Sequence, residues 1–249
     1  MKRNKLSFAM GNAKLNKRTA IFSIPAGHTC PAALLCKSKA DRITGKLTDG
    51  PQCEFRCFAA TGENLFKVTR ESRWRNWELL KACKGVAYDM ANLISLSLPK
   101  RNTDLCRVNA SGDFFSQAYF DAWLLVASSF PNIIFYAYTK QLHYWAARLP
   151  LIPSNLRLVA SRGGLHDVLI EKHNLRNVKV VFSESEAIEA NLPLDHDDTH
   201  AWKHTGNFAL LLHGTQPAGS IAGKVVYSLR KQGKGGYKAD YFKSYTKKG

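Results

Sequence analysis

Short apolar runs of strand type alternate with helical segments from residue 105 onward. The runs lie at 105–110, 133–138, 156–160, 178–182 and 207–212, and a further one precedes them at 21–24. Strands that alternate with helices at a spacing of this kind predict parallel βα units. The sequence therefore predicts an α/β fold, a partial parallel (βα)6 barrel. Its helices are expected at 63–82, 86–98, 117–129, 141–148, 165–173, 184–190 and 217–230.

Small polar clusters follow these runs. They are Ser111-Gly112-Asp113, Thr139-Lys140, Ser161-Arg162-Gly163-Gly164, Ser183-Glu184 and His213-Gly214. Because the carboxyl ends of parallel strands meet on one face, we expect these side chains to line an active site. The alternative is that they are helix caps and turns, which favour the same residue types.

Four cysteines lie within a loop expected at residues 28–62. Cys30, Cys36, Cys53 and Cys57 are close enough in sequence to suggest a metal site, whereas Cys83 and Cys106 lie in apolar surroundings and are predicted to be buried thiols. Two pairs of thiols can hold a zinc ion, and three thiolates can hold three irons of a 4Fe–4S cluster. Unrelated reduced thiols are the third interpretation.

The charge of the chain favours an anionic partner. It has 36 Lys and Arg against 19 Asp and Glu, a net charge of +17, and much of the excess lies near its two ends. We expect a basic segment at 1–20, one α/β domain at 21–230 and a basic tail at 231–249. Basic ends of this kind make nucleic acid a plausible partner.

No apolar run approaches the roughly 18 residues of a membrane span, so a membrane partner is not expected. The basic N-terminus is not followed by the apolar stretch of a secretion signal. The sequence therefore predicts a cytoplasmic protein, in which the cysteines stay reduced rather than forming disulfides.

The cysteines after the first strand, together with the partial barrel, resemble the radical S-adenosylmethionine (SAM) enzymes. Ser111-Gly112-Asp113 is similar to the turn after the second strand that holds the SAM amino group in that family, and Phe58 to an aromatic beside its last cysteine. The family spacing is CxxxCxxC, whereas Cys36 and Cys57 lie 21 positions apart here.

That resemblance implies a cofactor and a set of roles. Cys30, Cys36 and Cys57 would hold a 4Fe–4S cluster, with Cys53 as an alternative ligand, and SAM would chelate the fourth iron. Reductive cleavage of SAM would then yield a radical that abstracts hydrogen from a nucleotide or nucleic-acid substrate. The expected catalytic residues are Asp113, Lys140 and Arg162, and the expected cofactor-binding residues are Ser111, Gly112, Asp113, Ser161 and Glu184.

The chain as a whole resembles the bacteriophage gene product 88 family. The matching segments include KLSFAMGNAKL at 5–15, FSIPAGHTCPAALLC at 22–36, SGDFFSQAYFDAWL at 111–124 and LLLHGTQPAGS at 210–220. The resemblance implies a phage-encoded protein in the cytoplasm of the infected bacterium. It implies no particular activity.

Two further segments leave alternatives open. DHDDTHAWKH at 195–204 offers His196, Asp198 and His200 as a second metal site, as in a metal-dependent nuclease, or it forms an acidic turn and helix cap. The mixture of Arg and Trp at 70–77 suits phosphate binding and base stacking, but is more often core with Arg stems packed over it. A nucleic-acid-binding protein with a structural zinc and no catalysis is the remaining alternative.

Overall fold

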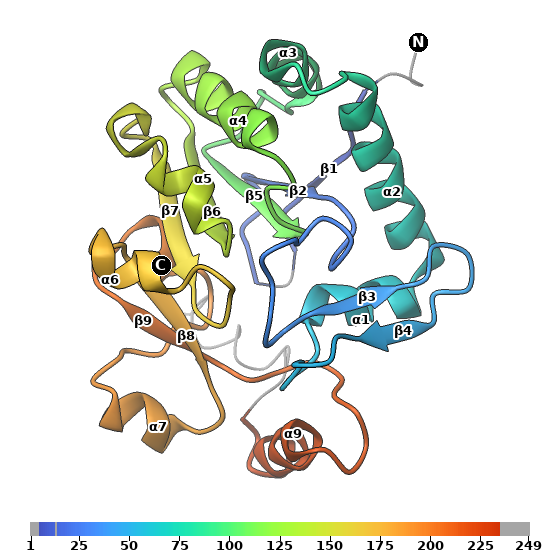
Figure 1. Cartoon of the computed structure of the whole chain (residues 1–249), viewed down its shortest axis with the longest axis vertical. Coiled ribbons are helices and arrows are strands. Elements are labelled where there is room, and N and C mark those ends of the chain that lie inside the picture. Colours follow the sequence, from blue (N-terminus) through green and yellow to red (C-terminus); the bar gives the residue numbers. More distant parts are fainter. Residues whose placement is uncertain (1–4, 13, 235–249) are drawn as a thin grey trace.

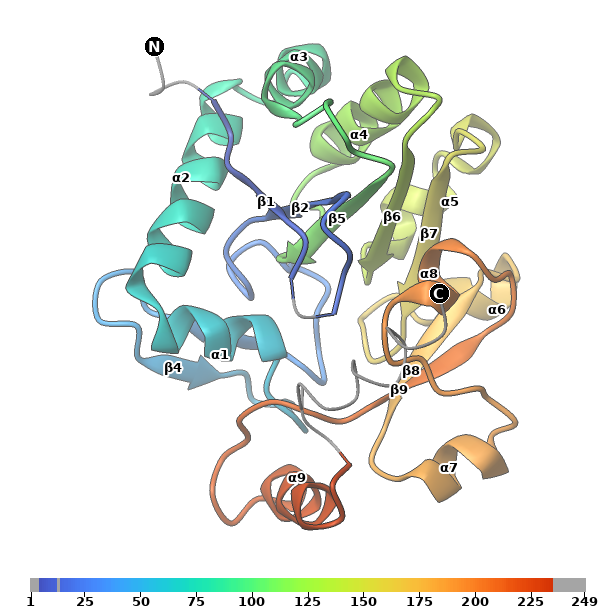
Figure 2. The same ribbon diagram turned by 180° about the vertical axis from the view of Figure 1, so that it is seen from behind.

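The computed structural model describes residues 5–12 and 14–234, and a seven-stranded sheet runs through its centre (Figure 1). The strand order is β1-β2-β5-β6-β7-β8-β9, so the six strands from β2 onward follow the order of the chain. These six are parallel, and β1 pairs antiparallel with β2 at the edge (Figure 2). The strands are β1 (Phe8–Met10), β2 (Thr19–Ser23), β5 (Leu105–Ser111), β6 (Ile134–Thr139), β7 (Leu156–Ser161), β8 (Asn177–Val181) and β9 (Phe208–Leu211).

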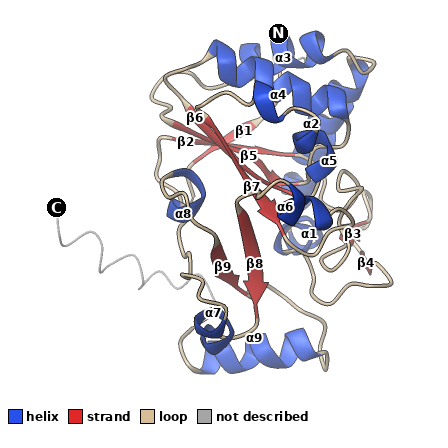
Figure 3. Ribbon diagram, turned by 60° about the vertical axis from the view of Figure 1, so that its left-hand side comes forward, coloured by secondary structure: helices blue, strands red, loops and turns tan. Residues whose placement is uncertain are grey.

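Helices surround the sheet, with α2, α5 and α6 on one side of it and α8 on the other (Figure 3). The main core lies between the sheet and α4, where Trp123 packs against Phe22 and Phe135 at ring distances of 5.5 and 6.1 Å. The helices are α1 (Phe58–Leu65), α2 (Lys67–Ala82), α3 (Ala87–Ser97), α4 (Gln117–Ser129), α5 (Leu142–Ala146), α6 (Val168–Lys172), α7 (Glu184–Glu189), α8 (Thr199–Trp202) and α9 (Ile221–Lys231), with a 3-10 turn at Leu149–Leu151.

The predicted α/β class with a mostly parallel sheet is confirmed, and each predicted strand lies within two residues of an observed one. The expectation of one helix over 63–82 is wrong, because the chain adopts an extended conformation at Phe66 and divides it into α1 and α2. The last helix begins at Ile221 rather than Pro217, because Ser220 caps it by accepting from the Gly223 amide at 3.0 Å.

The segment 28–62 is more ordered than a loop. It contains a hairpin of β3 (Ser38–Ala40) and β4 (Leu47–Asp49). The buried Arg70 side chain of α2 donates to the carbonyls of Arg42 and Ile43 in the turn of this hairpin, at 2.9 and 3.1 Å. A buried cation whose donors all meet backbone oxygens fixes the hairpin on the helix.

The basic ends differ from the expectation of separate segments. Residues 5–12 and 14–20 form β1, the turn after it and the start of β2, because Lys14 and Arg18 pair with Asp198 and Asp104. Lys231 ends α9 and Lys234 pairs with Glu184 at 2.6 Å, while the rest of the expected tail, 235–249, lies outside the described residues. Within the described ranges, no helix is long and apolar enough to cross a membrane.

Candidate functional site

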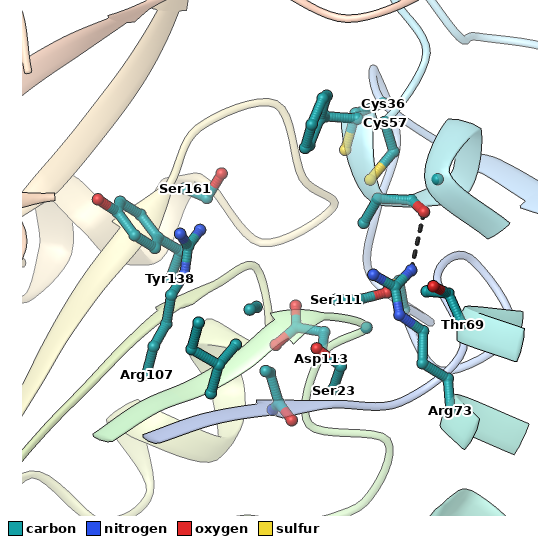
Figure 4. A pocket seen from close by; sticks show the side chains of 18 of the residues that line it. Ser23, Cys36, Cys57, Thr69, Arg73, Arg107, Ser111, Asp113, Tyr138 and Ser161 are labelled. Carbon is teal, nitrogen blue, oxygen red and sulfur yellow. Dashed lines mark hydrogen bonds between the residues drawn. The ribbon is translucent and has the colours of Figure 1, made fainter. Parts of the chain in front are cut away.

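A cavity of about 840 Å³ lies among the strand ends, a size typical of small-molecule sites (Figure 4). Its wall includes residues from the carboxyl ends of β2, β5, β6, β7 and β9 and from α1, α2 and the N-terminal segment. The lining residues used below are Ser23, Cys30, Cys36, Cys57, Thr69, Ser72, Arg73, Asn76, Arg107, Ser111, Gly112, Asp113, Tyr138, Thr139, Lys140, Ser161, Asp198 and His213, with Lys14 and Arg56.

Cys30, Cys36 and Cys57 all line this cavity, and Figure 4 shows Cys36 beside Cys57. Burial raises the pKa of the Cys30 thiol, and the neighbouring Asp113 and Cys57 raise it further. Burial also raises the pKa of Cys36 to about 11, with a contribution from Cys57 that opposes the effect of Lys140. The thiols are thus close enough to influence one another electrostatically, although 21 positions separate Cys36 from Cys57.

Local backbone structure brings the three thiols together. Leu34 and Leu35 donate to the Gly163 carbonyl, so the first cysteine loop is attached to the end of β7. Cys57 is the N-cap of α1, and its amide donates to Ser38 Oγ at 3.0 Å, at the start of the hairpin. The β3–β4 hairpin therefore accounts for the long spacing, because it leaves and returns to the same wall of the cavity.

The other cysteines lie elsewhere. Cys53 Sγ donates to the Phe55 carbonyl at 3.2 Å outside the cavity lining, Cys106 is fully buried in the core, and Cys83 at the end of α2 is partly buried against it. Across residues 5–12 and 14–234, no group of three or more His, Cys, Asp or Glu side chains is placed to hold a metal ion.

A bulge at the end of β5 directs Ser111 and Asp113 into the cavity. Ile21 pairs with Arg107 and Ser23 with Ser111, so β5 has two extra residues, and Asn109 among them has φ +52°. Gly112 follows with φ +80°, and a Cβ there would lie 2.4 Å from Thr29 Oγ1 and 2.5 Å from Ile24 Cγ1. Glycine is therefore required at this position by both conformation and close contact.

We expect Gly112→Ala to lower the free energy of unfolding by about 1–3 kcal/mol more than backbone strain alone does, because the added Cβ overlaps its neighbours. Gly85→Ala is the matched control, since Gly85 has φ +78° and nothing within 4 Å of its Cβ position. It should cost about 1 kcal/mol from backbone strain alone. Urea denaturation measures both, and equal losses would show that the contacts at Gly112 contribute nothing.

Asp113 joins two strand ends. One carboxylate oxygen accepts from Thr139 Oγ1 at 2.7 Å and from the Phe114 amide at 2.8 Å, and the other accepts from the Lys140 amide at 2.9 Å. Burial raises the pKa of Asp113 to about 6, although these hydrogen bonds oppose the effect. The second oxygen accepts one hydrogen bond and has capacity for another, and Asp113 lines the cavity, so it can still accept from a ligand.

Lys140 has a structural role that the sequence did not indicate. Its Nζ donates to the Ser161 carbonyl at 2.9 Å, to Ser161 Oγ at 3.1 Å and to the Arg162 carbonyl. An ammonium has three N–H donors, and all three are satisfied by the end of β7. Lys140 thus fixes the spacing of β6 and β7 in the cavity wall instead of presenting donors to a ligand.

Two other predicted residues face away from the cavity. Arg162 donates to Asn177 Oδ1 at 2.8 Å and pairs with Glu171 on α6 at 2.7 Å, and Glu184 pairs with Lys234. The cavity lining includes neither. His213, at the end of β9, does line the cavity, where burial and the nearby Lys14 and Arg107 lower its pKa to about 4. Its imidazole is therefore neutral at pH 7.

Asp198 lies in the cavity wall as part of an ion cluster. Its carboxylate pairs with Lys14 at 2.7 Å and Arg107 at 2.5 Å and accepts from the Tyr136 hydroxyl at 3.2 Å. Burial by itself raises the pKa of Asp198, but the two cations outweigh it and the pKa is lowered. His200 instead approaches Asp195 at 3.3 Å. The structure thus does not join His196, Asp198 and His200 into one metal site in the described chain.

Comparison with known proteins identifies the family. The model of the gene product 88 family matches residues 2–234. The chain belongs to the gene product 88 family. A relative, the gene 88 protein of Mycobacterium phage D29, is 31% identical over 94 residues, which cover 35% of this chain and 39% of the relative. No solved structure matches the chain. The predicted gene product 88 and bacteriophage assignments are confirmed, and these matches do not support the radical SAM resemblance.

Several cavity residues of this gene product 88 chain were missed by the sequence analysis. Arg107 lies within the apolar run 105–110, and a charged residue inside a buried strand is a usable signal for a polar interior. The sequence pattern at 70–77 favours Arg73 as an Arg stem packed over core tryptophans. The polar stripe of α2 at Thr69, Ser72, Arg73 and Asn76, with helical spacing, indicates the inward face instead.

Proposed function

We propose that this gene product 88 protein is an iron–sulfur enzyme similar in plan to radical SAM proteins. The observation that carries the proposal is the meeting of Cys30, Cys36 and Cys57 in one cavity at the carboxyl ends of parallel strands. The chain-order arrangement of the six parallel strands supports the same proposal, because it is the order of an open βα barrel.

The donor set suits a cluster better than a single ion. In a 4Fe–4S cluster each thiolate binds its own iron, so three thiols need not converge on one point. A structural zinc, by contrast, needs all its ligands around one centre, about 2.3 Å from each sulfur. The Gly27 amide donates to Cys30 Sγ at 3.3 Å, and hydrogen bonds to sulfur of this kind tune iron–sulfur sites.

The chain's own residues would shape the site around that group. Asp113 offers its remaining lone pair to an ammonium group, such as the amino group of SAM, next to the thiols. Lys140 and Ser161 hold the wall opposite α2 at a fixed distance. A cluster bound here would supply the electron that cleaves SAM, which is the chemistry of the radical SAM resemblance.

The charge of the chain supports an anionic substrate. A net charge of +17 favours a nucleotide or nucleic acid, and the expected setting is the cytoplasm of the infected bacterium. Asp198 gives no support to the nuclease alternative, because Lys14 and Arg107 already neutralise it.

Anaerobic purification followed by iron, sulfide and zinc analysis tests the proposal. We expect a brown protein with the broad visible absorbance of thiolate-bound iron, and formation of 5′-deoxyadenosine when SAM and a strong reductant are added. A colourless protein that contains stoichiometric zinc would overturn the iron–sulfur proposal in favour of the zinc-containing binding protein. A brown protein that neither binds nor cleaves SAM would refute the SAM part alone.

A further inference from the structure

The inward face of α2 is polar. Thr69, Ser72, Arg73 and Asn76, at helical spacing, all line the cavity. A helix that covers a sheet normally turns an apolar stripe inward. In the first half of α2 these polar side chains share the cavity lining with Val68, which is 79% exposed, and the apolar Leu80 is buried in the core only near the end of the helix. Because polar groups gain nothing from facing an apolar core, this stripe indicates a polar occupant of the cavity.

One nitrogen of the Arg73 guanidinium group, Nη1, fixes the side chain in place. Its Nη1 donates to the Ala59 carbonyl and to Glu63 Oε1, both at 2.9 Å, and the side chain is 16% exposed. The fully buried Glu63 also accepts from Ser111 Oγ at 3.1 Å, which ties Arg73 to the end of β5. In the described part of the chain, no residue accepts from Nε or Nη2 of Arg73.

Residues with hydroxyl groups line the cavity together with Arg73. Thr69 and Ser72 lie on the same face of α2, and Ser23 lies at the end of β2 across from them; Figure 4 shows Thr69, Arg73, Ser111 and Ser23 grouped on one side of the cavity. Asn76, by contrast, already has hydrogen-bond partners within the protein. Its Nδ2 donates to the carbonyls of Ser7 and Ser23, and its Oδ1 accepts from the Ser7 amide. Asn76 therefore fixes the position of Ser23 next to Arg73.

The charges in the cavity favour an anion there. Five cationic side chains line it, against two carboxylates, Asp113 and Asp198. Asp49 and Glu63 lie outside the lining but pair with Arg56 and Arg73. When these two carboxylates are counted as well, five cationic side chains face four carboxylates, and the net charge is still positive. A guanidinium with parallel N–H donors matches the two oxygens of a carboxylate or phosphate group.

We propose that Arg73, with the hydroxyls of Thr69, Ser72 and Ser23, forms a subsite that binds the carboxylate or phosphate group of a small-molecule ligand. This subsite deepens the proposed function. Its position beside an iron–sulfur cluster rests on that proposed function. The binding itself requires only the protein chain.

Calorimetric titration with inorganic phosphate and with succinate, each at constant ionic strength against chloride, tests the subsite. We expect saturable binding of at least one anion, weakened at least tenfold in Arg73→Gln because a charge-assisted hydrogen-bond pair is lost. Lys67→Gln removes the same charge from the solvent side of α2, where Lys67 is 75% exposed, and should bind as the wild type does. Preference for phosphate indicates a phosphate ester as the ligand, and preference for succinate a carboxylate.

Loss of folding is separated from loss of binding by a second variant. Arg73→Gln leaves Glu63 buried without its cation, so the double change Glu63→Gln with Arg73→Gln restores a neutral hydrogen-bonding pair. The double variant should fold and still fail to bind. Absence of anion binding in the wild type, or equal binding in the folded double variant, overturns the subsite. Iron content measured on the same samples reports on the cluster independently, so the two proposals fail separately.

Discussion

Cys57→Ala should abolish binding of the proposed iron–sulfur cluster, and Cys30→Ala and Cys36→Ala should do the same. In the proposed cluster each thiolate would bind one iron, so loss of any one would open the cluster to solvent and to loss of iron. Cys57 is the most informative of the three, because it comes from the far side of the hairpin and its position depends on the tertiary structure. Iron and sulfide analysis of the anaerobically purified variants measures the effect.

Two cysteine controls make this result specific. Cys83→Ala should keep full iron content, since Cys83 lies at the end of α2 and donates to the Leu79 carbonyl away from the cavity. Cys53→Ala should also keep it, because Cys53 Sγ is directed to the Phe55 carbonyl. Full iron content in Cys57→Ala together with loss in Cys53→Ala would reassign the third ligand to Cys53.

Asp198→Asn should lower the free energy of unfolding by about 3–5 kcal/mol, the usual cost of removing one partner from a buried ion pair. Asp198 is 1% exposed and neutralises Lys14 and Arg107, and an amide nitrogen in its place would face their N–H donors. The substitution removes the charge without adding backbone strain, because Asp198 has φ +64° and asparagine also tolerates that conformation. Chemical denaturation at neutral pH measures the loss.

Asp104→Asn is the matched control for this ion pair. Asp104 also pairs with an arginine, Arg18, but its side chain is 57% exposed, and exposed pairs contribute little to stability. The free energy of unfolding of Asp104→Asn should therefore be close to that of the wild type. Similar losses in both variants would contradict the argument from burial.

The effect of Asp198 should also depend on pH. The folded-state pKa of Asp198 is lowered, so its stabilisation is fully present above the unfolded value of about 3.9 and is lost as the pH falls through the folded-state value. The difference between wild type and Asp198→Asn should therefore be constant near neutral pH and narrow in acid. Loss of a bound metal from Asp198→Asn at neutral pH would support the nuclease alternative instead.

The strand-end positions of functional residues were only partly predictable. Asp113 and Ser161 follow strands and line the cavity, as the sequence predicts. Arg162 and Glu184 occupy equivalent places in the sequence, yet their side chains pair on the outside with Glu171 and Lys234. The end of a strand gives the position of a backbone segment. The direction of a long side chain depends on which partner lies within reach.

The alternation of apolar runs and helices by itself determined the order of the strands and the parallel sheet, because each run must be buried and each helix must return the chain to the same edge. Tertiary structure alone decided how Cys57 comes to lie beside Cys36 and which face of α2 is internal. Cys57 reaches Cys36 only after the hairpin folds back, and the α2 stripe with Arg73 faces a cavity that does not exist until the sheet is formed. Contacts between residues far apart in the chain are set by packing, and local sequence pattern does not encode them.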